Sequence, residues 1–250
     1  MKKYQVKDII KHYNSLKVLE DVSIEFDEYK TTCILGPSGC GKTTLLNIIA
    51  GIIDKDSGQI TGFKGKDMSF VFQEDRLIEW KNVKDNISFV LKHKMDKSQI
   101  ETTINRYLKL VNLEEYKYYY PKNLSGGMRQ RISILRAFAH PSSILIMDEP
   151  FKSLDINSKQ IVTEFFKKLM IMQNRTCILV THEIEEALNL GDKIVILSER
   201  PARVKKVIEN TFISSKSKAD KIIIRRQIEN ELIGNLSKCN PSVLLQKSHR

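Results

Sequence analysis

The chain alternates between short, continuously apolar runs and longer segments in which apolar residues recur every three or four positions. The first pattern is typical of buried strands and the second of amphipathic helices. Strands are predicted at 30–36, 142–150, 175–182 and 192–198. Helices are predicted at 42–52, 82–95, 98–113, 125–140, 158–173, 183–190 and 215–236. Because strands and helices alternate, we expect an α/β fold with a mostly parallel sheet covered on both faces.

Two stretches depart from this alternation. The first eighty residues have the pattern of strands around one helix, whereas residues 82–120 carry few strand signals and predict a helical insertion. Residues 237–250 are expected to fray at the end of the chain. No internal repeat interrupts this order.

Composition places the chain among ordinary globular proteins. Its 250 residues are 41% hydrophobic and 28% charged, enough for one large domain or two small ones. The four cysteines form no CxxC pair, which argues against a zinc site or a disulfide framework and fits a reducing cytosol. The basic N-terminus lacks the apolar region of a secretory signal, and every apolar run is far shorter than the roughly 18 residues that cross a bilayer. A membrane role therefore requires another chain to supply the span.

The net charge of +11 is concentrated at the C-terminal end. The last fifty residues hold 11 Lys or Arg and 4 Asp or Glu, so +7 of the total lies there. A solvated basic tail is one interpretation; attraction to an anionic membrane face or to nucleic acid is the other.

A phosphate-binding loop is predicted at residues 36–43, GPSGCGKT, which fits the pattern G-x-x-x-x-G-K-[ST] between a strand and a helix. Its glycines let backbone N–H groups close around a phosphate, and the helix N-terminus adds a favourable dipole. Lys42 is expected to reach the β- and γ-phosphates, and the Thr43 hydroxyl to bind Mg²⁺. The sequence therefore predicts a nucleoside triphosphate site.

Two carboxylates end the apolar run ILIMDEP at 144–150. In a parallel sheet, ligands bind at the carboxyl ends of the strands. Asp148 suits a Mg²⁺ ligand, and Glu149 suits a general base that activates water. His182, after the strand at 175–182, is expected at the same edge, although a lone histidine in such a place is more often structural.

Together, six motifs resemble those of ATP-binding cassette (ABC) proteins, the ATPase subunits of ABC transporters, over roughly residues 4–212. In chain order they are GPSGCGKTT (Walker A), FVFQED (glutamine loop), LSGGMRQR (signature), ILIMDEP (Walker B), SLD (D-loop) and VTHE (histidine switch). The resemblance implies a P-loop NTPase fold: an ABC-type cassette with a mostly parallel core sheet, an antiparallel N-terminal β part and a helical subdomain. The implied division is 1–81 with 138–214 as the catalytic lobe, 82–137 as the helical subdomain, and 215–250 as a basic extension.

The resemblance also assigns roles by position. Nucleotide contacts are implied for Tyr13 (adenine stacking), Gly36, Pro37, Ser38, Gly39, Cys40, Gly41, Lys42, Thr43 and Thr44. Tyr4 and His12 are alternatives to Tyr13 as the stacking residue. Mg²⁺ ligands are implied for Thr43, Gln73 and Asp148. Catalytic roles are implied for Lys42, Gln73, Glu149 and His182. A second subunit's ATP is the implied partner of Ser125, Gly126, Gly127 and Asp155, since cassettes of this family pair head to tail.

Similarity is greatest to the nitrate, sulfonate and taurine importer group, through VFQEDRLIEWKNVKDNI, LSGGMRQRISILRAF, DEPFKSLD and LSERPARV. It implies an ATPase with ATP and Mg²⁺ as cofactors, bound at the cytoplasmic face of the cell membrane. Its implied partners are a transmembrane permease, a second copy of itself and, indirectly, an extracytoplasmic substrate-binding protein, with no specific nucleic acid. The alternatives are a soluble cassette ATPase acting on ribosomes or DNA, an exporter subunit, and a nucleotide switch without turnover.

Four residues either allow two interpretations, depart from the family pattern or suggest a reactive thiol. Trp80 either anchors the permease interface or packs against the helical insertion. Tyr29 lies in a segment, Glu28–Lys30, where the family usually turns with glycine and glutamate, and Lys152 replaces a glycine common in DEPFGALD-type sequences. Cys40 lies near a helix N-terminus, which predicts a lowered thiol pKa and sensitivity to thiol reagents.

Overall fold

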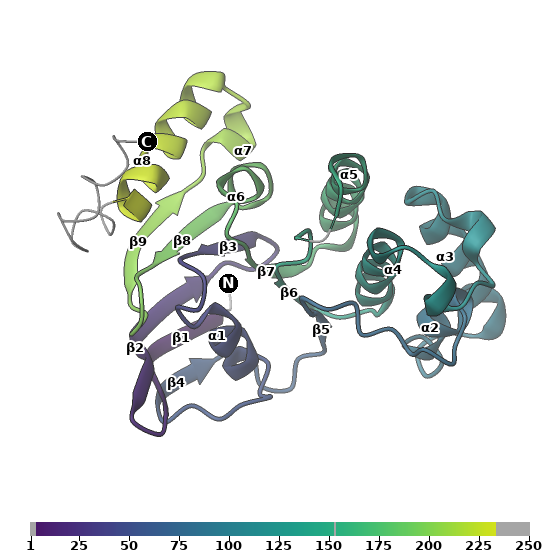
Figure 1. The fold of residues 1–250 in the computed structure, drawn as a ribbon, viewed down its shortest axis with the longest axis horizontal. Coiled ribbons are helices and arrows are strands. Elements are labelled where there is room, and N and C mark those ends of the chain that lie inside the picture. Colours follow the sequence, from purple (N-terminus) through teal and green to yellow (C-terminus); the bar gives the residue numbers. More distant parts are fainter. Residues whose placement is uncertain (1–3, 153, 234–250) are drawn as a thin grey trace, which may run out of the picture. The chain divides into compact units, whose positions relative to one another are not determined.

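The computed structural model describes residues 4–152 and 154–233, and this part of the chain forms two compact units (Figure 1). The first unit consists of Tyr4, Phe26–Thr31 and Thr61–Val180. The second consists of Gln5–Glu25, Thr32–Ile60 and residues 181–233.

A parallel sheet organises the first unit. Its strands are β5 (Met68–Val71), β6 (Ile144–Asp148) and β7 (Thr176–Val180). Val71 pairs with Met147, and Asp148 pairs with Val180, so the three strands end at one edge. Every residue of β6 and β7 is buried, as expected for strands covered on both faces.

Helices make up most of the rest of this unit. They are α2 (Val83–Phe89), α3 (Lys97–Leu110), η1 (Glu114–Tyr116), η2 (Pro121–Asn123), α4 (Gly126–Ala139) and α5 (Ile156–Gln173). Each α-helix begins after a residue whose side chain accepts a hydrogen bond from the first turn: Asn82, Asp96, Ser125 and Asp155. Such N-caps satisfy backbone N–H groups that the helix leaves unpaired, and they determine where each helix starts. Phe138 of α4 packs edge-on against Phe165 of α5.

The second unit contains an antiparallel β part. Strands β1 (Tyr4–Tyr13), β2 (Leu16–Phe26) and β4 (Ser57–Thr61) form a sheet in the order β2-β1-β4; the end residues Tyr4, Phe26 and Thr61 are grouped with the first unit. Asn14, with φ of 55°, lies in the two-residue turn between β1 and β2, a connection that only an antiparallel pair allows.

The remaining elements of the second unit are a second set of strands and the helices next to them in the chain. They are β3 (Thr31–Leu35), α1 (Lys42–Ile49), α6 (Ile184–Leu190), β8 (Lys193–Leu197), β9 (Val204–Glu209), α7 (Phe212–Ser215) and α8 (Lys218–Ile233). Strand β3 pairs with β8 in parallel, and β8 pairs with β9 antiparallel. Both β3 and β8 are fully buried.

The predicted α/β class is confirmed: parallel strand pairs, an antiparallel N-terminal β part and a helical segment are all present. Strand β9 was not predicted, because its sequence VKKVIE contains two adjacent lysines and lacks a strict apolar alternation. The helix predicted at 215–236 corresponds to α8, which begins at Lys218; the short helix α7 before it was not predicted, and Lys216 between the two has φ of 54°. Residues 234–236 and the predicted fraying at 237–250 lie outside the described residues. Within the described chain, no helix is long and apolar enough to cross a membrane.

Candidate functional site

The predicted phosphate loop follows β3 and leads directly into α1. Gly39 has φ of 75° and Gly41, the N-cap of α1, has φ of 123°, two backbone conformations that favour glycine. Ser38 and Gly39 are exposed, as is Thr43 in the first turn of the helix, while Thr44 is half-buried. The loop therefore presents backbone and hydroxyl groups on the surface at a helix N-terminus.

The lysine of this loop is drawn inward. The side chain of Lys42 is 5% exposed, and its ammonium group donates to the carbonyl oxygens of Gly36 and Pro37, each at 2.8 Å. These carbonyl oxygens compensate a buried positive charge. These two hydrogen bonds fix the loop backbone to the Lys42 ammonium group, which is predicted to bind the phosphates.

An arginine far along the chain also holds this loop. Arg200, in the turn after β8, donates a hydrogen bond to the carbonyl of Gly39. Arg200 could not be predicted as a partner of Gly39, because the two residues are 161 positions apart and no local pattern relates them. Arg200 belongs to LSERPARV, a stretch that contributes to the family resemblance.

Cys40 corrects one expectation. Its side chain is buried, and burial raises the pKa of the thiol, although the charge of Lys42 acts in the opposite direction. The prediction of a lowered pKa is wrong, because desolvation at this position outweighs the helix N-terminus and the neighbouring cation.

The three aromatic candidates for adenine stacking lie in different surroundings. Tyr4 is 4% exposed and packs on Phe63 with ring centroids 5.1 Å apart, so its ring is part of a core. His12 contacts Asp56 through its ring Nδ1 at 3.1 Å. Tyr13 is 43% exposed, with the ammonium of Lys11 5.5 Å from its ring centroid. Of the three, Tyr13 has the ring that is most accessible to a ligand.

His182 belongs to the second unit, as do the phosphate loop and Tyr13. It is exposed and follows Thr181, whose backbone N–H donates to the carbonyl of Ile34 at the end of β3. The Thr181 hydroxyl bonds to the buried Glu186 of α6 and accepts from the backbone N–H of Glu183. Hydrogen bonds on both sides of His182 thus determine its place just beyond the end of β3.

The remaining predicted site residues of the sheet lie at the carboxyl ends of β5 and β6, in the first unit. Asp148 ends β6 and is 4% exposed, Glu149 follows it, and Gln73 comes two residues after the end of the neighbouring strand β5. Because Val71 pairs with Met147 in a parallel register, Gln73 and Glu149 leave the sheet at the same edge. This edge has the placement that the sequence predicted for Gln73, Asp148 and Glu149.

Glu149 is held in a specific backbone conformation. Its φ is 45°, in the left-handed region that non-glycine residues rarely adopt, and its N–H donates to the carbonyl of Val180 at 2.9 Å. Its side chain is 11% exposed, and Oε2 lies 2.9 Å from Nζ of Lys152. In the sequence, Lys152 is only a departure from the family pattern, whereas the structure brings it to the predicted general base.

The signature segment forms the start of α4. Ser125 is the N-cap, with its hydroxyl accepting from the N–H of Met128 at 3.3 Å. Ser125 and Gly126 are exposed, so the first turn of this 14-residue helix is open to solvent. The segment implied to meet a second subunit's ATP is therefore a helix N-terminus on the surface of the first unit, a place that favours anions.

Asp155 lies beside this helix start. A β-carbon added at Gly127 would be 3.8 Å from Oδ2 of Asp155, so the D-loop and the signature segment are neighbours. Asp155 is also the N-cap of α5, where hydrogen bonds from Ser158 lower the pKa of its carboxyl group. It is thus kept as an anion with a structural role in its own subunit.

The segment after Gln73 is tied to α4 by charged side chains. Nε of Arg129 lies 3.0 Å from Oδ2 of Asp75, and Arg136 donates to the carbonyl of Arg76 at 2.9 Å. A pocket of about 500 Å³ lies here. Its lining consists of Gln73, Glu74, Asp75, Arg76, Leu77, Glu79, Gly126, Arg129 and Gln130. Residues of both the glutamine loop and the signature helix α4 line this pocket, and both segments belong to the first unit.

Trp80 is the most prominent exposed aromatic residue near this segment. Its side chain is 80% exposed, whereas Leu77 is 7% exposed. The alternative in which Trp80 packs against the helical insertion is therefore wrong.

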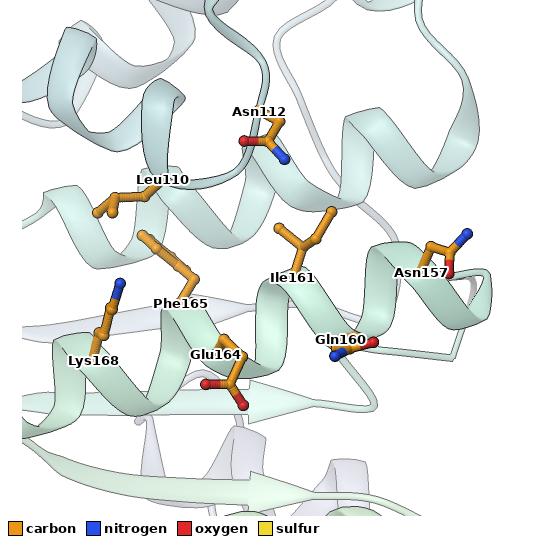
Figure 2. Close-up of a pocket in the computed structure, with 8 residues that line it drawn as sticks. All are labelled: Leu110, Asn112, Asn157, Gln160, Ile161, Glu164, Phe165 and Lys168. Carbon is orange, nitrogen blue, oxygen red and sulfur yellow. The ribbon is translucent and has the colours of Figure 1, made fainter.

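A second pocket, of about 440 Å³, lies between α5 and the end of α3 (Figure 2). Figure 2 shows Ile161 and Phe165 of α5 pointing toward the segment that carries Leu110 and Asn112. None of the predicted site residues lines it. Among the described residues, no group of three or more His, Cys, Asp or Glu side chains could hold a metal ion by itself.

The sequence matches the ABC transporter family over residues 19–152. The aliphatic sulfonates import ATP-binding protein SsuB of Bacillus cereus is 37% identical over 214 residues, covering 83% of this chain and 84% of that protein. The taurine import ATP-binding protein TauB of a Jannaschia species is 33% identical over 232 residues, covering 88% and 87%.

Solved structures extend the likeness to the fold. A dimeric structure of the ATP-binding cassette MJ0796, in a post-hydrolysis state bound to ADP and Pi, superposes with a TM-score of 0.74 at 27% identity. The match covers 83% of this chain and 98% of that cassette. Both the sequence and the fold are thus similar to those of nucleotide-binding cassettes.

Proposed function

Because the chain belongs to the ABC transporter family, we propose that it drives the import of a small sulfonate- or taurine-like solute through a separate permease. It is an ATPase and the ATP-binding subunit of an importer-type transporter. The observation that carries the proposal is the polar edge at the ends of β5 and β6, which places Gln73, Asp148 and Glu149 together. The names of relatives that import sulfonates and taurine support the class of solute.

In this proposal the phosphate loop binds the triphosphate of ATP. Backbone N–H groups of residues 38–44 cradle the phosphates, and Lys42 exchanges its contacts with the carbonyls of Gly36 and Pro37 for phosphate oxygens. Tyr13 stacks on the adenine with its exposed ring. His182 contacts the γ-phosphate.

The residues assigned to Mg²⁺ have the chemistry that this ion requires. Thr43, Gln73 and Asp148 supply a hydroxyl, an amide and a carboxylate oxygen, all hard ligands. Mg²⁺ is usually bound by one or two carboxylates together with substrate phosphates and water. When bound, the ion would neutralise charge that develops on the phosphates.

Glu149 is the proposed general base. Its carboxylate accepts a proton from water as the water oxygen bonds to the γ-phosphorus and the bond to the β,γ-bridging oxygen breaks. Glu149 directly follows the last residue of β6, and its backbone has an uncommon positive φ. Together, the rigid strand and this backbone conformation determine the direction in which its side chain projects.

We assign the signature segment to the ATP of a second copy of the chain. Ser125, Gly126 and Gly127 offer a helix N-terminus to that γ-phosphate, and Asp155 lies beside them. Dimer closure would then depend on ATP, and hydrolysis would remove the bridge. The dimeric structure of the similar cassette MJ0796 supports this arrangement.

The proposed location, partners and division of the chain are those that the family resemblance implies. The working complex is proposed to lie at the cytoplasmic face of the membrane, with an extracytoplasmic substrate-binding protein delivering the solute to the permease. Exposed Trp80 supports a protein contact near the glutamine loop. We propose that residues 1–81 and 138–214 form a catalytic lobe, 82–137 a helical subdomain and 215–250 a basic extension.

The decisive test combines one substitution with one uptake measurement. Glu149→Gln should reduce steady-state ATPase activity by orders of magnitude while ATP binding remains, and uptake of labelled taurine or alkyl sulfonate by cells should fall with it. The matched control is Glu164→Gln, an exposed carboxylate on α5, which should change neither. Full activity of Glu149→Gln would remove Glu149 as the base.

Co-purification addresses the partner. A multi-span membrane protein should accompany the tagged chain after mild detergent extraction. Recovery of ribosomes or DNA in its place would contradict the importer assignment, whatever the outcome at Glu149.

A further inference from the structure

The phosphate loop contains one peptide that is held from both sides. The carbonyl of Gly39 accepts a hydrogen bond from the guanidinium of Arg200. The N–H of Cys40, which belongs to the same peptide, donates to the carbonyl of Pro37 at 3.3 Å. Because a peptide unit is planar, these two hydrogen bonds together fix the orientation of the Gly39–Cys40 peptide.

This peptide lies where the loop backbone has most freedom. Gly39 occupies the third position of the four-residue turn at 37–40, and its φ of 75° is close to the value of about 80° typical of a type II turn. Glycine populates other backbone conformations almost as readily, so its own preference does not hold the turn. Ser38 and Gly39 are both exposed, so packing adds little. A hydrogen bond from outside the loop is therefore the main restraint on this peptide.

Arg200 comes from a turn that is bound to a neighbouring strand. This turn, residues 198–203, connects β8 to β9. The N–H of Ala202 donates to the carbonyl of Val18 at 2.9 Å, and the carbonyl of Ala202 accepts from the N–H of Glu20 at 3.0 Å. The backbone that carries Arg200 is thus attached to β2.

The phosphate loop contacts the same two strands. A β-carbon added at Gly36 would be 3.2 Å from Cβ of Leu197, the last residue of β8. A β-carbon added at Gly41 would be 2.9 Å from side-chain carbons of Val18 and Leu19 on β2. All of these residues belong to the second unit. The loop and the turn after β8 therefore share one support, which fixes the distance between them.

We propose that Arg200 is a positioning residue for ATP binding, whose guanidinium holds the Gly39 carbonyl and keeps the loop in the conformation that receives the phosphates. The inference rests on the proposed binding of the triphosphate by residues 38–44. Loss of this hydrogen bond frees the Gly39–Cys40 peptide to reorient, so only a fraction of the molecules presents a competent loop before ATP arrives. The apparent Kd is inversely proportional to that fraction.

The expected effect is modest because the contact lies at the surface. Arg200 is exposed, so its hydrogen bond competes with water and contributes less than a buried one. Removal of the guanidinium should therefore raise Kd and KM for ATP by about fivefold. Bound phosphates hold the loop themselves, so kcat should not change.

The test compares wild type, Arg200→Met and Arg200→Lys in nucleotide binding and ATPase kinetics. Arg200→Met should raise Kd for ATP and for ADP by the same factor, because both nucleotides place phosphates in the loop. Arg200→Lys should recover most of the affinity, since one guanidinium nitrogen donates to Gly39 and an ammonium group can replace it. The matched control is Arg203→Met, which removes an arginine of the same turn whose Nη2 lies 3.1 Å from Oε1 of Glu20; it should change neither Kd nor KM.

Several outcomes would overturn this role of Arg200. A larger loss of affinity for ATP than for ADP would mean that Arg200 acts on the γ-phosphate or through its charge alone, since ATP carries the additional phosphate. A lower melting temperature and a lower kcat at unchanged KM would assign Arg200 to folding only. A lysine variant that binds no better than the methionine variant would also refute the hydrogen bond as the cause.

Lys42→Ala separates this inference from the proposed function. It should weaken ATP binding strongly if the loop receives the triphosphate. Wild-type affinity in Lys42→Ala would remove the loop as the phosphate site. Wild-type affinity in Arg200→Met, with binding by Lys42→Ala impaired, would overturn the role of Arg200 alone.

Discussion

Gly41 offers the sharpest test of how the phosphate loop is built. Its φ is 123°, and a β-carbon there would lie 2.9 Å from side-chain carbons of both Leu19 and Val18. Gly51, just beyond α1, has φ of 70° but meets nothing within 4 Å. Gly41→Ala therefore combines backbone strain with overpacking, whereas Gly51→Ala, its matched control, introduces the strain alone.

These differences give the expected magnitudes. The strained conformation should cost about 1 kcal/mol at Gly51 and at least as much at Gly41, whose φ is farther from the left-handed region. Overpacking against β2 should add about 2 kcal/mol at position 41, because the neighbouring side chains are buried and have little room to move. At about 3 °C per kcal/mol for a chain of this size, Gly41→Ala should melt about 6 °C below Gly51→Ala.

Thermal unfolding followed by circular dichroism measures this difference, and a fluorescent ATP analogue measures binding. Gly41→Ala should also weaken nucleotide binding, because the displaced residue precedes Lys42 and is the N-cap of α1. Equal melting temperatures of the two variants would refute the reasoning, since both the close approach and the larger φ predict a greater loss of stability at Gly41.

Three further predictions address other parts of the chain. Ser125→Arg should abolish steady-state ATPase activity and leave nucleotide binding to the isolated monomer intact; an equal loss of binding would mean that the signature segment acts on its own ATP. Because burial raises the pKa of Cys40, iodoacetamide should modify it more slowly than it modifies glutathione at neutral pH, as measured by mass spectrometry. Contacts with Lys11 and His12 lower the pKa of Asp56 to about 2, so the stability that this carboxylate adds is present above about pH 4 and is lost as the pH falls toward 2. The stability difference between wild type and Asp56→Asn should shrink over that interval in pH-dependent melts, and a constant difference would exclude the ionised contacts as its source.

Much of the fold was predictable because its signals are local. The buried strands β3, β6, β7 and β8 are continuous apolar runs, and α4 and α5 follow capping residues that the sequence displays directly. Strand β9 was missed for the opposite reason: its two lysines and exposed residues resemble a loop until pairing with β8 supplies its hydrogen bonds.

The candidate site divides in the same way. The phosphate loop and the Asp148–Glu149 pair were predictable, since each depends on a strand followed by a defined turn. Arg200 was not, because its partner Gly39 is 161 positions away. The pKa of Cys40 was predicted with the wrong sign, since proximity to a helix N-terminus is visible in the sequence but the depth of burial is not.

The sequence by itself therefore determined the order of elements, the phosphate loop and the strand-end carboxylates, because backbone conformation and hydrophobic period depend on neighbouring residues. Only the tertiary structure decided which side chains are desolvated and which distant groups meet, as for Cys40 and for Arg200 at Gly39. It also decided that Lys152 lies against Glu149, because a buried Phe151 and a hydrogen bond from α4 hold the turn that joins them. Burial and long-range pairing arise when the chain folds, and no local pattern specifies them.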